Sequence, residues 1–166
     1  MKKFLAVLLA VLMLVSMTAC GASEPAASEA PAAEAEAPAA KVYNVGICQL
    51  VTHDALDAAT QGFQDALVAI LGADAVTFDV QNAAGDSNTC ASIANAFVAS
   101  EVDLIMANAT PALQAASAAT ADIPILGTSV TEYGVAMGIE NFTGTVGGNV
   151  SGTSDLAPLS EQAAMV

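Results

Sequence analysis

The residues best suited to binding a small polar molecule sit in short segments that follow apolar stretches of the chain. They carry amide, hydroxyl, imidazole or carboxylate groups, which form hydrogen bonds and can pair with a charged ligand. In open parallel sheets, ligands bind beyond the carboxyl ends of the strands, where such segments meet. We therefore expect ligand-binding side chains at Gln49, Thr52, His53, Asn108, Thr110, Thr128, Ser129 and Asp155.

The step from Thr110 to Pro111 is the clearest local signal for an anion site. Thr favours the position before a helix and Pro suits its first turn, so the next backbone N–H groups are free to face an anion. A ligand carboxylate fits there; the alternative is that Thr110 only caps its own helix. Thr52 or Asp54 is expected to cap the first helix in the same way.

Enzymatic chemistry has little support in the sequence. His53 is the only histidine, which excludes metal sites built on several histidines and allows a Ser–His relay only if His53 alone is the base. The nucleophile-elbow, zinc-protease and P-loop patterns are absent. We expect no catalytic residue, no metal and no cofactor.

The hydrophobic pattern predicts the elements that position these residues. Apolar runs predict strands at 42–48, 75–80, 103–107, 123–127 and 149–154. Helical periodicity predicts helices at 54–71, 89–100 and 111–120, the first with Leu56, Phe63, Leu67 and Ile70 on one face. This alternation predicts an α/β fold, a Rossmann-like parallel sheet with right-handed crossovers and helices on both faces.

Residues 1–20 read as an export signal followed by a lipidation site. Lys2 and Lys3 precede the apolar run 4–15, which is shorter than the roughly 20 residues a membrane-spanning helix needs. Small residues and Cys20 come next, in a pattern that resembles the lipobox of bacterial lipoproteins. The resemblance implies that acyl chains on Cys20 anchor the protein to the outer face of the cell membrane.

Residues 21–40 are almost wholly Ala, Glu, Pro and Ser, and we expect a disordered acidic linker there. Residues 41–166 are then the folded region. The whole chain has 17 acidic and 3 basic residues and a formal net charge of −14, which argues against nucleic acid as a partner. Cys48 and Cys90 could pair in an exported protein, or serve only as small apolar packing groups.

Several motifs in order resemble those of ABC transporter substrate-binding lipoproteins, in the family that includes tryptophan and tyrosine uptake proteins. They are VGICQL at 45–50, HDALD at 53–57, GFQD at 62–65, Asn82 with GD at 85–86, DLI at 103–105, ATP at 109–111 and GNVSGTSD at 148–155. The resemblance implies a type I periplasmic-binding fold, whose two lobes close on a solute that is passed to a membrane permease and its ATPase. An aromatic amino acid is the implied solute.

The chain departs from the family pattern in two places. Glu132, within VTEY at 130–133, stands where family members carry Thr-Asp-Pro. Family members are also about twice as long, so 41–166 is expected to be the first lobe and the start of the crossover, with 159–166 an unfinished helix.

Other functions remain open from the sequence alone. Gln49, Asn82 and Asp86 would suit a sugar or nucleoside ligand. A receptor-coupled sensor ectodomain and an anchored hydrolase using His53 or a thiol are the further alternatives.

Overall fold

The computed structural model describes residues 41–165. The expected export signal, lipidated Cys20 and acidic linker lie outside this range. Its strands are β1 (Tyr43–Gln49), β2 (Val76–Asn82), β3 (Leu104–Asn108), β4 (Ile125–Val130) and β5 (Val150–Ser154). Its helices are α2 (Asp54–Leu71), the 3-10 turn η1 (Ala73–Ala75), α3 (Ser87–Ala99), α4 (Thr110–Ala119), α5 (Tyr133–Met137) and α6 (Leu159–Ala164).

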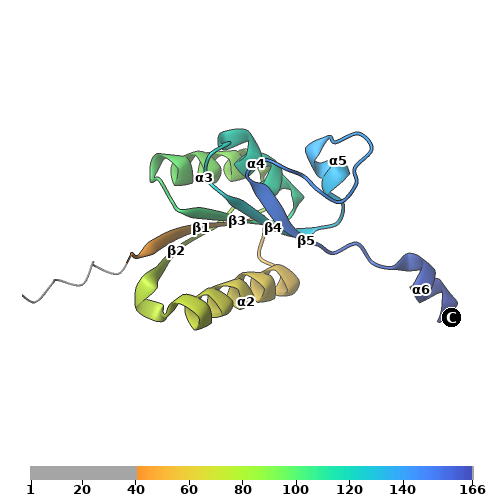
Figure 1. The fold of residues 1–166 in the computed structure, drawn as a ribbon, viewed down its shortest axis with the longest axis horizontal. Helices are drawn as coiled ribbons and strands as arrows, with labels where there is room; N and C mark the ends of the chain where they lie inside the picture. Colours follow the sequence, from red (N-terminus) through yellow and green to blue (C-terminus); the bar gives the residue numbers. More distant parts are fainter. Residues whose placement is uncertain (1–40, 166) are drawn as a thin grey trace, which may run out of the picture. The chain divides into compact units, whose positions relative to one another are not determined.

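All five strands are parallel, in the order β2-β1-β3-β4-β5. The chain moves one way along the sheet from β1 to β2 and the other way in every later crossover. Right-handed crossovers therefore place α2 on one face and α3, α4 and α5 on the other, as Figure 1 shows. The predicted α/β class, parallel sheet and two-sided helix layer are confirmed.

Each face of the sheet has its own core. Phe97, Ile105, Leu113 and Ile125 are fully buried between the sheet and α3 and α4. On the other face, Ile47 and Met106 pack against Phe63 and Leu67 of α2. Ile70 is 76% exposed, so its predicted place on the buried face was wrong. The buried stripe of α2 thus ends before its last turn.

The face of the sheet that carries α2 is only partly covered, because one helix cannot span a five-stranded sheet. Beside α2, a groove of about 340 Å³ opens over β3, β4 and β5. Its walls include Phe63, Met106, Leu126 and Thr128. None of the helices within 41–165 is long and apolar enough to cross a bilayer.

Candidate functional site

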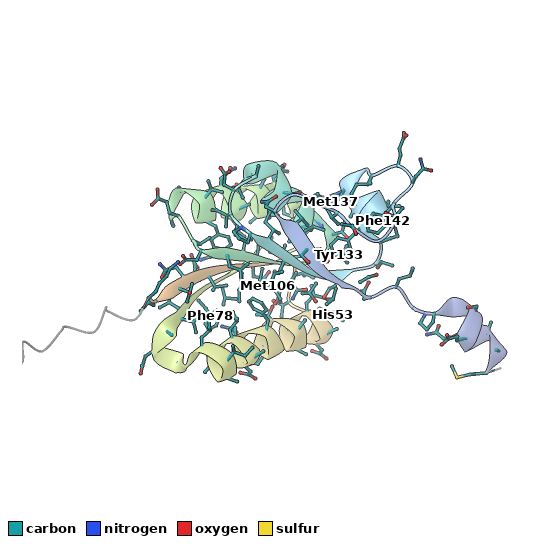
Figure 2. The ribbon with its side chains drawn as sticks, viewed as in Figure 1. His53, Phe78, Met106, Tyr133, Met137 and Phe142 are labelled. Carbon is teal, nitrogen blue, oxygen red and sulfur yellow. The ribbon has the colours of Figure 1, made fainter. Side chains whose placement is uncertain are left out.

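The carboxyl ends of the five strands form one edge of the sheet, and the predicted site residues lie along it. In the strand register Gln49 of β1 is opposite Asn108 of β3, which is opposite Thr128 of β4. Val130 pairs with Ser154, which places the following residue, Asp155, at the same edge. Figure 2 shows His53, at the start of α2, at this end of the sheet as well. We call these strand ends and the loops that follow them the carboxyl edge.

Gln49 and Asn108 point into the protein, toward α2. Both are buried, and a network joins them to α2: the Thr60 hydroxyl donates to Gln49 Oε1 at 2.6 Å, and Asn108 Nδ2 donates to Thr60 Oγ1 at 3.0 Å. Gln49 Nε2 also donates to the Asp57 carboxylate, and Asn108 Nδ2 to the Leu56 carbonyl. The network fixes the start of α2 against β1 and β3.

Asn108 Oδ1 is the exception in this network. Among the buried side-chain oxygen and nitrogen atoms of the described residues, Asn108 Oδ1 alone has no hydrogen-bond partner. Such a group costs about 1–3 kcal/mol, and proteins keep few of them.

Thr52 and His53 are exposed, and the side chain of each already makes a hydrogen bond within the chain. His53, rather than the expected Thr52 or Asp54, is the N-cap of α2, and its Nδ1 accepts the Ala55 N–H at 3.2 Å. Thr52 accepts a hydrogen bond from Asn82 Nδ2 at 3.2 Å. His53 Nε2 and the Thr52 hydroxyl proton remain able to face a ligand.

The start of α4 differs from the expected arrangement in a way that suits an anion. The N-cap is Ala109, and Thr110 and Pro111 are the first helical residues. No side chain caps this helix. An uncapped helix start presents backbone N–H groups and the positive end of the helix dipole to the carboxyl edge.

Thr128, Ser129 and Asp155 surround an irregularity in the sheet. The register between β4 and β5 shifts between Gly127 and Val130. Tyr133 of α5 fills the gap: its hydroxyl donates to the Thr153 carbonyl at 3.2 Å. Burial raises the pKa of Tyr133, and the charge of Asp155 raises it further.

Three of the five non-glycine residues with a positive φ angle in 41–165 lie at the same edge. Ala84, Ala109 and Ser129, just after β2, just after β3 and within β4, all have positive φ angles, of 52°, 95° and 55°. Residues with a Cβ adopt such angles at a cost and are enriched at functional sites. Alanine carries no local signal for this conformation, so the sequence could not reveal Ala84 and Ala109.

The charges at the carboxyl edge are unbalanced. Lys41 is the only Lys or Arg in 41–165, and it pairs with Asp103 at 2.8 Å at the amino end of the sheet. This pair lowers the pKa of Asp103. Within 41–165, Asp155 therefore has no lysine or arginine beside it, and this part of the chain offers an anion at the carboxyl edge neutral hydrogen-bond donors rather than a lysine or arginine.

Two other acidic side chains near this edge already cap helices. Asp86 caps α3 by accepting from the N–H groups of Asn88 and Thr89. Glu132 caps α5 through the N–H groups of Gly134 and Val135. Within 41–165 no three His, Cys, Asp or Glu side chains are grouped as metal ligands.

Comparison with known proteins assigns the family. Residues 44–166 match the family described as ABC transporter substrate binding protein. A tyrosine-binding protein of Clostridioides difficile is 43% identical over 156 residues, a match that covers 93% of this chain and 45% of the relative. The chain thus spans less than half the length of that relative.

Solved structures agree with this assignment. The ligand-free, open form of a substrate-binding protein with adhesive properties from Clostridium difficile is 43% identical, with a TM-score of 0.69 over 75% of this chain and 42% of that one. A Streptococcus protein in complex with L-Trp is 33% identical, with a TM-score of 0.63 over 69% of this chain and 39% of that one. These are solute-binding proteins, and the fold is that of one lobe of the type I periplasmic-binding class. The chain belongs to the ABC transporter substrate-binding protein family.

Proposed function

We propose that this chain forms the first lobe of an extracytoplasmic solute-binding component of an ABC importer, and that its solute is an amino acid, an aromatic one such as tyrosine or tryptophan. Cys20 carries the lipid anchor. The solute is held between this lobe and a second one, and closure presents it to the permease and its ATPase. The family membership and the tyrosine- and tryptophan-binding relatives support the proposal.

The layout of charge at the carboxyl edge is the observation that carries the amino-acid assignment. The uncapped start of α4 attracts a carboxylate, and unpaired Asp155 attracts an ammonium group. These two features follow β3 and β5, which are separated by β4 and so lie about 10 Å apart at the usual strand spacing. An α-amino acid, with a hydrogen bond of about 2.9 Å on either side, bridges such a gap.

The sugar or nucleoside alternative is weakened by the same geometry. It relies on Gln49, Asn82 and Asp86, and the polar atoms of all three already bond within the chain. A hydroxyl-rich ligand would have to break these bonds first.

Ligand analogues test the assignment group by group. We expect binding of L-tyrosine to this chain, measured by calorimetry, to weaken about tenfold when its ammonium is removed, since hydrogen bonds to charged groups are worth about 1.5–3 kcal/mol. In the Asp155→Asn variant this difference should largely vanish, while removal of the tyrosine carboxylate should still weaken binding. Asp122→Asn, an exposed change at the amino end of β4, is the matched control.

Two outcomes would overturn the proposal. One is that Asp155→Asn binds tyrosine and its deaminated analogue with the same tenfold difference as the unchanged chain. The other is that a sugar or nucleoside binds more tightly than every amino acid tested.

A further inference from the structure

Cys48 and Cys90 come together in the core between β1 and α3. Both are fully buried and both belong to the same apolar cluster. Burial raises the pKa of Cys48 to about 12, and the neighbouring Cys90 adds to the rise. Both side chains thus occupy the same buried layer, between the sheet and the helices on this face.

The packing of α3 on β1 explains this closeness. Gly46 and Cys48 lie two residues apart on β1 and so face the same side of the sheet. Cys90 and Phe97 lie two helical turns apart on α3 and share its buried stripe. A Cβ on Gly46 would lie 2.7 Å from the Phe97 ring, so this ring rests directly on the strand backbone. Because Gly46 has no side chain, α3 can approach β1 closely. Cys48 of β1 and Cys90 of α3 lie on the facing sides of these two elements, one position closer to the carboxyl edge than Gly46 and Phe97.

Backbone hydrogen bonds hold both cysteines in place. After β2, the Ala83 N–H donates to the Gln49 carbonyl at 2.9 Å and the Gly85 N–H to the Leu50 carbonyl at 2.7 Å. The Cys90 N–H donates to the Asp86 carbonyl at 3.1 Å in the first turn of α3. The end of β1 is thus tied to the loop that leads into α3, next to both thiols.

We propose that Cys48 and Cys90 are a cross-linking site, at which a disulfide joins the end of β1 to the first turn of α3. Both are free thiols in this structure. This inference rests on the packing and on the extracytoplasmic location in the proposed function, and it does not depend on the proposed solute. Extracytoplasmic proteins meet the oxidising conditions that such a bond needs.

The cross-link forms by thiol–disulfide exchange with an oxidant that itself carries a disulfide, such as glutathione disulfide or a protein oxidant. The Cys90 thiolate attacks one oxidant sulfur, making a mixed disulfide and releasing one oxidant thiolate. The Cys48 thiolate then attacks the Cys90 sulfur and releases the second. Two electrons pass to the oxidant, and the two protons end on its two released thiols.

The burial of the two thiols determines the stage of folding at which this exchange takes place. The raised thiol pKa values make both groups unreactive in the folded lobe, because the thiolate is the nucleophile. Exchange therefore occurs while α3 is still unpacked, during folding or local opening. Once formed, the bond holds Gln49 and Leu50 against α3, directly beside the carboxyl edge.

The test uses the full 166-residue chain in mild detergent with Cys20→Ser, which leaves Cys48 and Cys90 as its thiols. The chain is unfolded and refolded in a glutathione redox buffer, alkylated under denaturing conditions and cut at Asp. Several Asp residues separate the two cysteines, so their peptides stay together only if a disulfide joins them. Cys48→Ala and Cys90→Ala, each in the same background, are the controls.

For the chain with both cysteines we expect the joined peptide and no alkylated thiol. Its melting temperature should lie about 10 °C above that of the reduced chain, which is the usual effect of closing a loop of this length. Neither control should give the joined peptide, because each has only one of the two thiols. Quantitative alkylation of both thiols after refolding would overturn the proposal. So would a joined chain that melts below the reduced one, or that has lost its folded circular-dichroism spectrum.

Discussion

The contact between Gly127 and Tyr133 holds together the irregular part of the sheet that carries Thr128 and Ser129. A Cβ on Gly127 would lie 2.5 Å from the Tyr133 hydroxyl oxygen and 3.2 Å from the nearest ring carbons. Gly127 has an ordinary backbone conformation, so steric crowding is the only reason it excludes a side chain. Gly127→Ala should therefore destabilise the lobe through this one contact.

The magnitude follows from the two distances. Overpacking costs about 1–3 kcal/mol, while replacing a strand glycine by alanine returns roughly 0.5–1 kcal/mol. We expect a net loss of about 1–2 kcal/mol in the free energy of unfolding. Tyr133→Phe alone loses the bond to the Thr153 carbonyl, worth about 0.5–1.5 kcal/mol. In the double variant the hydroxyl is gone, so the alanine should cost little more.

Urea unfolding of the four proteins gives this coupling directly. We expect the double variant to be at least about 1 kcal/mol more stable than the sum of the single losses implies. Gly62→Ala, in α2 with nothing within 4 Å of its added Cβ, is the matched control and should be neutral or slightly stabilising. Strictly additive losses from Gly127→Ala and Tyr133→Phe would refute the reasoning.

Two further predictions concern stability. Asp86→Ala removes the N-cap of α3, whose Oδ1 accepts hydrogen bonds from Asn88 N at 2.6 Å and Thr89 N at 2.9 Å, and should lower the free energy of unfolding by about 1 kcal/mol. The control Asp122→Ala should change it by no more than about 0.5 kcal/mol. Equal effects of the two substitutions in urea unfolding would count against the capping role of Asp86. The folded-state pKa of Cys48 is raised to about 12, so its contribution is full below the unfolded thiol pKa of about 8.5 and is lost as the pH rises toward 12. Reduced Cys48→Ala should thus lose stability less steeply between about pH 9 and pH 11 than the reduced parent, and parallel pH profiles would contradict this reading.

Much of the fold could be predicted because strands and helices differ in hydrophobic period. The predicted bounds of the first helix, 54–71, match α2, and each predicted strand overlaps an observed one, with ends shifted by up to three residues. The short helix α5 was missed because its five residues, YGVAM, carry no periodic pattern. Ile70 was misplaced because periodicity shows which residues share a face, whereas burial depends on how far the sheet extends beneath the helix.

The candidate site was predictable in place but not in detail. Residues that follow strands of a parallel sheet must meet at one edge, and Gln49, Asn108, Thr128 and Asp155 do so. Which of them face a ligand depends on tertiary partners: Thr60 and Asp57 of α2 occupy Gln49, and no local pattern announces such a pairing. The positive φ of Ala109 is likewise imposed by the surrounding fold.

Mapping ligand contacts on this chain by NMR tests the central claim, that the carboxyl edge is the solute-binding half of a clamp. We expect L-tyrosine to shift the backbone amide signals at the start of α4, at 128–129 and at Asp155. Signals at the amino end of the sheet, from Lys41 to Asn44 and around Asp103 and Asp122, should stay in place. Shifts confined to the amino end, or to the groove beside α2 without the start of α4, would contradict it.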